Sequence, residues 1–147
     1  MSTTEIQKEA NTRITNISRS EQLHQVARDY VLKGLGAKNF DAIPYDENVI
    51  LRAPICPGGS ARPLKGKESL RTIWWTPLPT LLGKVEFIDS FVNESNTAVT
   101  VEFHCEVLNP SCTLRVIDRF KVNEEGKITE QENFFDPRDL TNPGWKE

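Results

Sequence analysis

The chain has 147 residues and a net charge of −3, with 37% hydrophobic and 27% charged residues, which is typical of a single soluble globular domain. It has no basic stripe, and this argues against nucleic acid or an anionic membrane as the main partner. It also lacks an apolar run of transmembrane length and an apolar N-terminal signal segment, so we expect a cytoplasmic protein with no membrane partner.

Cysteine and histidine content argues against a cofactor. The three cysteines, Cys56, Cys105 and Cys112, do not form the even set of a disulfide framework. The two histidines, His24 and His104, are too few for a dedicated zinc site. No CxxC, HExxH or GxGxxG motif occurs. We therefore predict neither a metal nor another cofactor.

The first part of the chain predicts a helix followed by a strand. Residues 1–17 are polar with scattered isoleucines, and we treat them as a separate N-terminal segment. Apolar residues then recur at helical spacing, which predicts an amphipathic helix over about 19–35. Residues 39–48 predict a short helix or turn, and residues 49–53 a strand.

The second part predicts another helix and a run of strands. A helix over about 65–75 should end before Pro77, because the residue preceding a proline disfavours the helical conformation. Four strands joined by short turns follow, at roughly 84–92, 97–107, 113–122 and 127–135. This order predicts an α+β domain over 18–140, with helices packed on one face of a curved antiparallel sheet and a tail at 141–147.

One predicted strand carries a carboxylate among apolar residues. In the stretch LRVIDRF, Leu114, Val116 and Phe120 share one face, and Asp118 lies on that same face. Burying an isolated ionised carboxylate is strongly unfavourable. Asp118 is therefore protonated, paired with another group, or directed into a pocket. In an apolar pocket its pKa would be raised, which suits a general acid or base near neutral pH.

Strand pairing gives Asp118 polar neighbours on the covered face. The register that best matches apolar with apolar residues sets Asp118 opposite Val101 on one side and Gln131 on the other. Asn133 then lies diagonally beside Asp118. Asp89 falls opposite Val101 and becomes a second candidate carboxylate, although a one-residue slip would turn it to solvent.

These neighbours have structural as well as functional interpretations. Gln131 and Asn133 are ligand-orienting amides or hydrogen-bond partners of a structural Asp118. Tyr45 is a hydroxyl donor at a pocket mouth or a half-buried tyrosine. Several aromatic residues either line a ligand cavity or simply pack in the core: Trp74, Phe87, Phe91, Phe103 and Phe120. The same register puts Cys105 on the covered face as an inert thiol and His104 on the outer face.

The C-terminal stretch DRFKVNEEGKITEQENFFDPRDL resembles the last hairpin of nuclear-transport-factor-2-like proteins, especially the SnoaL-like polyketide cyclase branch. The matching residues are Asp118, Phe120, Gly126, Ile128, Asn133, Phe135, Asp136 and Pro137. The stretches NFDAIPYDENVILRAP and PLKGKESLRTIWW resemble the first strand and second helix of that family. The resemblance covers about residues 20–140.

The resemblance implies a cone-shaped fold, in which a strongly bent sheet wraps around a long helix and encloses an apolar pocket. It also implies a homodimer formed through the convex sheet face. Epoxide hydrolases of the family carry an aspartate at the position of Asn133, and an asparagine cannot take a proton from water. The cyclases use a histidine and an aspartate on neighbouring strands, as His104 and Asp118 would be if a bulge turned His104 inward.

From these observations we formulate a working hypothesis. The protein is a small cofactor-independent enzyme that binds a hydrophobic, carbonyl-bearing molecule and moves a proton, as an isomerase, cyclase or dehydratase does. Asp118 is the acid or base, Asn133 and Gln131 orient the substrate or a water, and Asp89 is a possible second carboxylate. The alternatives are a non-catalytic small-molecule-binding protein and a dimeric interaction protein of the same fold.

Overall fold

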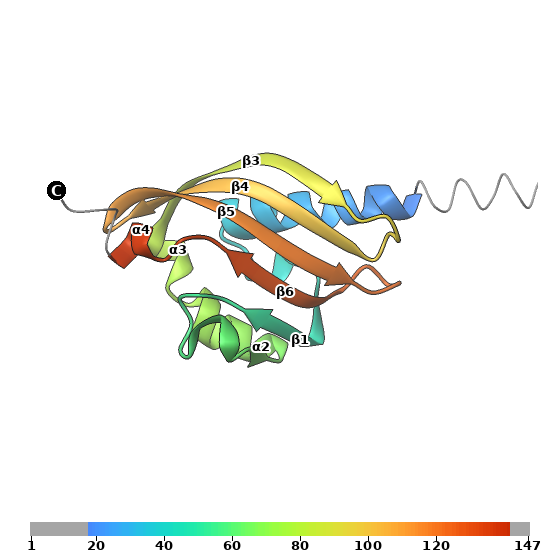
Figure 1. Cartoon of the computed structure of the whole chain (residues 1–147), viewed down its shortest axis with the longest axis horizontal. Coiled ribbons are helices and arrows are strands. Elements are labelled where there is room, and N and C mark those ends of the chain that lie inside the picture. Colours follow the sequence, from blue (N-terminus) through green and yellow to red (C-terminus); the bar gives the residue numbers. More distant parts are fainter. Residues whose placement is uncertain (1–17, 142–147) are drawn as a thin grey trace, which may run out of the picture.

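The computed structural model describes residues 18–141 and builds them around one curved six-stranded sheet with the strand order β2-β1-β6-β5-β4-β3 (Figure 1). The predicted segment 1–17 lies outside the described residues, and so does the predicted tail apart from Thr141. The few helices and the strongly bent, unclosed sheet confirm the predicted α+β class and its cone shape.

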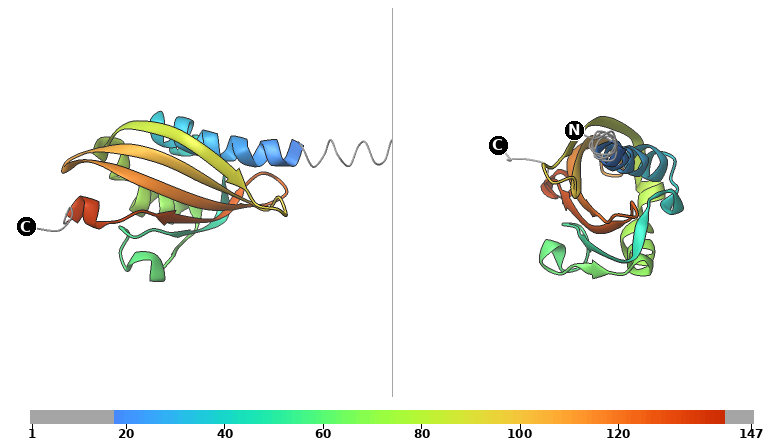
Figure 2. Two further views of the ribbon diagram at one scale, coloured as in Figure 1. Left: turned by 45° about the horizontal axis from the view of Figure 1, so that its top comes forward. Right: turned by 90° about the vertical axis from the view of Figure 1, so that its right-hand side faces the viewer.

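The long first helix runs along the inside of the curved sheet. Residues 18–28 are α-helical, and the helix continues with π-helical geometry as η1 (Asp29–Gly36), in agreement with the helix predicted over 19–35. Its apolar face is buried, including Tyr30 and Val31. Seen end-on, the strands curl into an open ring with this helix on one side (Figure 2).

The next elements build the lower part of the sheet seen in Figure 1. The 3-10 helix η2 (Phe40–Ala42) leads into β1 (Tyr45–Arg52), which starts earlier than the predicted strand over 49–53. β1 pairs antiparallel with the short β2 (Leu64–Lys65), after the 3-10 turn η3 (Gly59–Ala61). β1 also pairs in parallel with β6, and no local sequence pattern predicted this pairing.

The second predicted helix is present in two sections. α2 (Lys67–Ser69) continues directly as η4 (Leu70–Trp75), which matches the prediction over about 65–75. The short α3 (Leu78–Leu81) follows Pro77 and leads straight into the sheet. Its last residue, Leu81, directly precedes β3, so this helix turns the chain from the helical layer into the run of antiparallel strands.

The C-terminal strands form the long antiparallel part of the sheet. They are β3 (Leu82–Val92), β4 (Ala98–Leu108), β5 (Ser111–Val122) and β6 (Ile128–Phe134), followed by α4 (Arg138–Thr141). The β4–β5 register is the predicted one, with Val101 opposite Asp118 and His104 opposite Arg115 on the outer face. His104 therefore does not form a pocket pair with Asp118.

The β5–β6 register differs from the prediction because the hairpin is irregular between Lys121 and Val122. Asp118 lies directly opposite Asn133, whereas we predicted Gln131 at that position. The difference is two residues, so each side chain stays on its predicted face. The change brings Asn133 from a diagonal to an adjacent position.

The β3–β4 register contains an irregularity that reverses a predicted face. Phe87 lies opposite Phe103 as predicted, but the register shifts by one residue between Phe87 and Asp89. Asp89 consequently pairs with Glu102 and is exposed, so its predicted position on the covered face is wrong. Phe91 is also turned outward and is 54% exposed.

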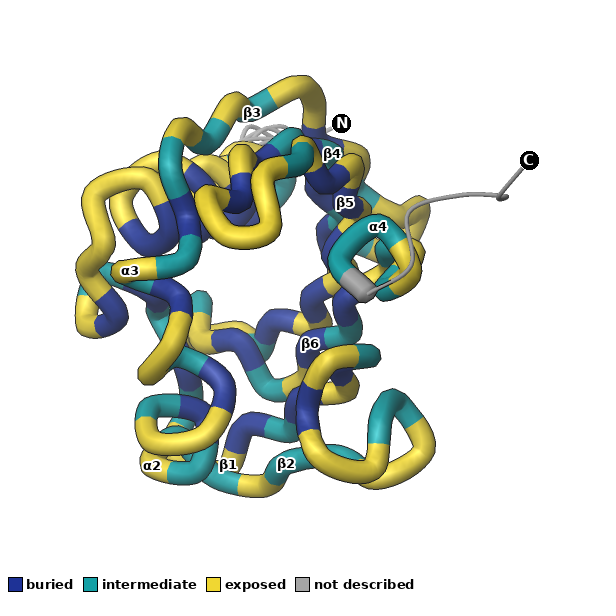
Figure 3. The backbone as a smooth tube through the Cα atoms, turned by 90° about the vertical axis from the view of Figure 1, so that its left-hand side faces the viewer, coloured by how far each residue is buried: buried dark blue, intermediate teal, exposed yellow. Residues whose placement is uncertain are grey.

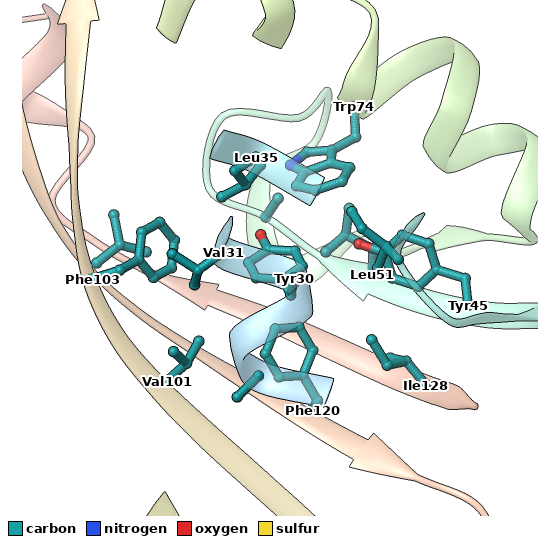
Figure 4. Packing of buried hydrophobic residues seen from close by; sticks show 14 of the residues in the cluster. Tyr30, Val31, Leu35, Tyr45, Leu51, Trp74, Val101, Phe103, Phe120 and Ile128 are labelled. Atoms are coloured by element: carbon teal, nitrogen blue, oxygen red, sulfur yellow. The ribbon is translucent and has the colours of Figure 1, made fainter. Parts of the chain in front are cut away.

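The core lies between the first helix and the concave face of the sheet, and buried and exposed residues alternate along the strands (Figure 3). Tyr30 is at its centre (Figure 4). The Tyr30 ring lies 4.7 Å from that of Phe120, 6.0 Å from Phe103 and 6.4 Å from Trp74, between centroids. Among residues 18–141, the helices are too short or too polar to cross a membrane.

Candidate functional site

The carboxyl group of Asp118 lies inside the cone and is only half satisfied by hydrogen bonds. The residue is 1% exposed. The hydroxyl group of Tyr30, on the first helix, donates a hydrogen bond of 2.7 Å to Asp118 Oδ2. The other oxygen, Oδ1, is buried and has no hydrogen-bond partner within residues 18–141. An unsatisfied buried polar atom is uncommon in folded proteins and calls for an explanation.

A chain of buried polar side chains supports this arrangement. Gln131 Nε2 donates to the Tyr30 hydroxyl oxygen at 3.2 Å and to Asn133 Oδ1 at 2.9 Å. The Tyr45 hydroxyl, from β1, donates to Gln131 Oε1 at 2.6 Å. The parallel β1–β6 pairing makes this last contact possible. Because each member is bonded to the next, these polar groups can be buried inside an apolar core.

Burial governs the protonation of the site. It raises the pKa of Asp118 to about 8, and the hydrogen bond from Tyr30 lowers that pKa only in part. Asp118 is therefore mostly protonated at neutral pH. Burial, followed by the nearby Asp118, also raises the pKa values of Tyr30 and Tyr45 well above their ordinary value. Both tyrosines remain neutral hydrogen-bond donors.

A mainly apolar cavity of about 50 Å³ reaches Asp118 and Asn133. The residues that line it are Tyr30, Leu35, Ile55, Trp74, Leu78, Leu81, Leu82, Phe103, Cys105, Val107, Leu114, Val116, Asp118, Asn133, Phe135 and Leu140. α3 and α4 contribute to the wall and lie at the same end of the molecule (Figure 1). The volume holds only a few water molecules, so a larger ligand requires these elements to move.

The structure brings together part of the predicted site. Asp118, Asn133, Phe103 and Trp74 line the cavity. Cys105 also lines it, and burial raises the pKa of its thiol to about 12, which agrees with the predicted inert thiol.

The other predicted site residues lie away from the cavity wall. Gln131, Tyr45 and Phe120 are buried behind it. The expected position of Tyr45 at the pocket mouth is wrong, because its hydroxyl is enclosed and bonded to Gln131. Phe87 is half-buried, outside the wall, with the Arg28 guanidinium 6.0 Å from its ring centroid. Asp89 is exposed on the outer surface.

Sequence reasoning missed the role of Tyr30. Helical spacing places Tyr30 on the apolar face of the first helix, but it indicates no partner for the hydroxyl group. A buried tyrosine hydroxyl usually finds a hydrogen-bond partner, so a polar group on the covered face of the sheet could have been sought. Strand periodicity also does not place the wall residues that come from short helices and loops, such as Leu78, Phe135 and Leu140.

No group of three or more His, Cys, Asp or Glu side chains in the described part of the chain is arranged to hold a metal ion. Apart from Asp118, the charged residues of β5 and β6 lie on the outer face of the sheet. There, Arg119 lies 3.7 Å from Glu132 and Lys121 lies 3.2 Å from Glu130, between side-chain N and O atoms.

Comparison with known proteins identifies the fold. No protein-family model matches the chain, and no curated protein matches it either. Among solved structures, RV0760c from Mycobacterium tuberculosis has a TM-score of 0.67 and 16% identity, covering 81% of this chain and 93% of that chain. SalBIII, an epoxide hydrolase/cyclase-like enzyme of pyran ring formation in salinomycin, has a TM-score of 0.65 and 19% identity, covering 84% and 95%. A steroid delta-isomerase from Pseudomonas aeruginosa has a TM-score of 0.60 and 18% identity, covering 74% and 76%.

These likenesses establish a shared architecture. Proteins described as NTF2-like are among the matches, so the chain has the nuclear-transport-factor-2-like fold that its C-terminal sequence resembles. The fold is shared with cyclase-like and isomerase enzymes. One structure of RV0760c is a complex with estradiol-17β-hemisuccinate. At these levels of identity the comparison extends to the fold and not to the substrate.

Proposed function

We propose that this protein is an enzyme that moves a proton on a hydrophobic, carbonyl-bearing small molecule, in an isomerase, cyclase or dehydratase type of reaction. The observation that carries the proposal is Oδ1 of Asp118, which lies in the wall of an apolar cavity and has no hydrogen-bond partner among the described residues. A buried carboxyl group with a raised pKa in such a position is typical of acid–base sites. The steroid ligand of RV0760c and the isomerase and cyclase-like enzymes of the same fold support the proposed ligand class.

The carboxyl group of Asp118 suits proton transfer in both directions. Tyr30 holds Oδ2, which leaves Oδ1 to take up or release a proton. A carboxyl group with a pKa of about 8 is a stronger base when ionised than an ordinary carboxylate. The ionised group removes a proton from the carbon next to the substrate carbonyl, and the C–H electron pair forms an enolate. The protonated group then returns the proton to another carbon in an isomerisation, or to a departing hydroxyl, which leaves as water.

One carboxyl group performs both steps in this proposal. Among the wall residues in the described part of the chain, Asp118 is the sole carboxylate, and neither histidine nor lysine is present. Asn133, opposite Asp118, is next to the position where the substrate carbonyl would lie. Gln131 acts from behind the wall, through its hydrogen bond to Asn133.

The proposal is tested by solvent exchange at carbon. The full chain is incubated in D₂O with a panel of apolar β,γ-unsaturated ketones, and NMR measures deuterium incorporation next to the carbonyl. The wild type should accelerate exchange, and Asp118→Asn should reduce the enzymatic rate by about a hundredfold or more. Asp89→Asn is the matched control, because Asp89 is an exposed carboxylate on the outer surface. Wild-type exchange rates in Asp118→Asn would refute the role of Asp118.

Ligand binding without turnover is the second candidate function. The single carboxyl group in the described cavity wall favours it, because many proton-transfer sites use two titratable groups. Mass spectrometry of small molecules that co-purify with the protein from its native host would identify the ligand class. A bound apolar ketone that undergoes no exchange in the D₂O assay would favour this second function.

The homodimer implied by the sequence resemblance also remains a proposal. Ile117 on β5 and Phe134 on β6 are register partners, and they are 43% and 45% exposed on the outer sheet face. An apolar pair on this face is suited to contact with a second copy. Light scattering during size-exclusion chromatography gives the mass in solution, and a monomer at all concentrations would contradict the proposal. The cytoplasmic location stays a prediction.

A further inference from the structure

The side-chain amide of Gln131 is held in one orientation by Tyr45. The Tyr45 hydroxyl has one hydrogen, and it donates this hydrogen to Gln131 Oε1 at 2.6 Å. The amide nitrogen of Gln131 therefore faces the opposite way, where its two hydrogens are donated to Tyr30 and Asn133 at 3.2 and 2.9 Å. Every polar atom of this buried side chain is thus used.

This orientation determines which end of the Asn133 amide remains available. Asn133 Oδ1 accepts the hydrogen bond from Gln131. Within residues 18–141 no group accepts a hydrogen bond from Asn133 Nδ2, and Asn133 keeps 6% exposure where it lines the cavity. Gln131 is absent from the wall. The oxygen of Asn133 is therefore directed toward Gln131, which leaves the N–H₂ group for the cavity.

The free N–H₂ group lies beside the open oxygen of Asp118. The two residues are directly opposite in the β5–β6 pair, where Cβ atoms are about 5 Å apart on one face of the sheet. Both side chains line the same cavity, and the remainder of the wall is mostly aliphatic and aromatic. An oxygen atom of a ligand can therefore approach both groups at once.

We infer that Tyr45 and Gln131 are positioning residues that hold the Asn133 N–H₂ group toward the cavity, so that the site selects a ligand whose polar end is a hydrogen-bond acceptor, such as a ketone. This inference rests on the proposed function for the carbonyl class and specifies which end of the molecule enters. An alcohol of the same shape is disfavoured. Tyr30 already donates to Oδ2, so the proton of the neutral carboxyl group lies on Oδ1, and the O–H hydrogen of an alcohol meets only this weakly accepting hydroxyl oxygen and an N–H₂ donor.

Removing the Tyr45 hydroxyl should release this selection. In Tyr45→Phe, nothing holds Gln131 Oε1, so the amide can reverse and present its oxygen to Asn133. The Asn133 amide can then reverse as well and turn its own oxygen toward the cavity. The ring of Tyr45 packs 5.5 Å from that of Phe40 and 6.5 Å from that of Trp74, between centroids. Phenylalanine preserves these contacts, so the variant should retain the fold.

The test compares cyclopentanone with cyclopentanol, two probes of nearly equal shape. Their dissociation constants are measured from chemical-shift changes of the isotope-labelled full chain, at about pH 6, where a carboxyl group with a raised pKa is protonated. The wild type should prefer the ketone by about tenfold or more. In Tyr45→Phe and Gln131→Leu the ratio should fall to about one or reverse. Phe40→Leu, which alters packing against the Tyr45 ring without removing a hydroxyl, should keep the wild-type ratio.

Each outcome of this experiment decides the inference. It is overturned if Tyr45→Phe keeps the wild-type ratio, if the wild type prefers the alcohol, or if the wild type binds neither probe. The binding measurement requires no turnover. Ketone preference without any carbon exchange in D₂O would therefore reject the proposed reaction and support the amide orientation. Exchange activity together with an unchanged ketone-to-alcohol preference in Tyr45→Phe would support the reaction and reject the amide orientation.

Discussion

Asp118 should make the folded state less stable as the pH rises through neutrality. Its pKa is about 8 in the folded protein, against about 4 for an aspartate in an unfolded chain. Between these values the folded state binds a proton that the unfolded state has lost. Because the folded-state pKa is the higher one, the stabilising contribution is complete below about pH 4 and is lost progressively up to about pH 8.

The size of this effect follows from the pKa difference. Each pKa unit corresponds to about 1.4 kcal/mol, so the free energy of unfolding falls by on the order of 4 kcal/mol between about pH 4 and pH 7 through this group alone. Asp118→Asn removes this dependence, because an amide does not ionise. The Asn oxygen can still accept the hydrogen bond from Tyr30, but the new N–H₂ group lacks an acceptor, which costs about 1–3 kcal/mol.

The two variants should therefore exchange their order of stability within this range. We expect the wild type to be the more stable protein at about pH 4.5 and Asp118→Asn to be more stable by about 1–3 kcal/mol at about pH 7.5. Urea unfolding, followed by circular dichroism at a series of pH values, measures the difference in free energy of unfolding between the two proteins. The contributions of the other carboxylates largely cancel in this difference, because both proteins contain them. Asp89→Asn is the control, with an exposed carboxylate, and it should show no such crossing. A difference between wild type and Asp118→Asn that stays constant with pH would refute the assignment of a buried protonated carboxyl group.

Three further substitutions test the supporting structure. Tyr30→Phe removes the hydrogen bond that lowers the folded-state pKa of Asp118, so the upper pH limit of the stability loss should rise in the same urea series while the lower limit, set by the unfolded state, stays in place. An unchanged upper limit would contradict this. Phe120→Ala empties a fully buried site in the core and should cost about 3–5 kcal/mol in urea unfolding, where a loss below about 1 kcal/mol would show that the packing is looser than described. Gly34→Ala would place a Cβ atom 2.5 Å from Ile43 Cγ1, and thermal unfolding should reveal a destabilisation of about 1–3 kcal/mol instead of the gain expected from helix propensity alone.

The register of β4 and β5 could be predicted because nothing interrupts the alternation of their side chains. Apolar residues pair across these strands without a bulge, and a one-residue slip would have buried charged residues. The inward position of Asp118 followed from that register. Its raised pKa follows in turn from burial, because burial disfavours the charged form of a carboxyl group.

The register of β3 could not be predicted because its apolar pattern favours the wrong face. Placing Phe91 inward required Asp89 inward as well, whereas the structure exposes both and buries Ser90. Ser90 Oγ lies 2.6 Å from Nδ1 of His24 on the first helix. A hydrogen bond between distant parts of the chain thus satisfies the buried hydroxyl of Ser90, and periodicity within one strand contains no information about it.

The Tyr45–Gln131 contact could not be predicted from the sequence for a similar reason. It depends on the parallel pairing of β1 with β6, whose residues are far apart in the sequence. A short turn between two strands predicts that they pair as an antiparallel hairpin. A parallel partner lies far along the chain, so the residues next to a strand do not indicate it. The orientation of Asn133 depends on that contact, so the sequence identified the amide without its direction.

The arrangement around Asp118 is difficult to explain as a stabilising device. A carboxyl group that served only the fold would gain from having both oxygens bonded. One of them is buried at a cavity wall with no partner in the described part of the chain. A leucine-like residue would avoid both the unsatisfied oxygen, at about 1–3 kcal/mol, and the loss of stability with rising pH. Meanwhile Tyr30, Tyr45 and Gln131 are all engaged in fixing the polar groups around this carboxyl. A network that orients an acid at a net cost to folding is expected where the acid meets a ligand, because a ligand in the cavity can supply the missing hydrogen bond.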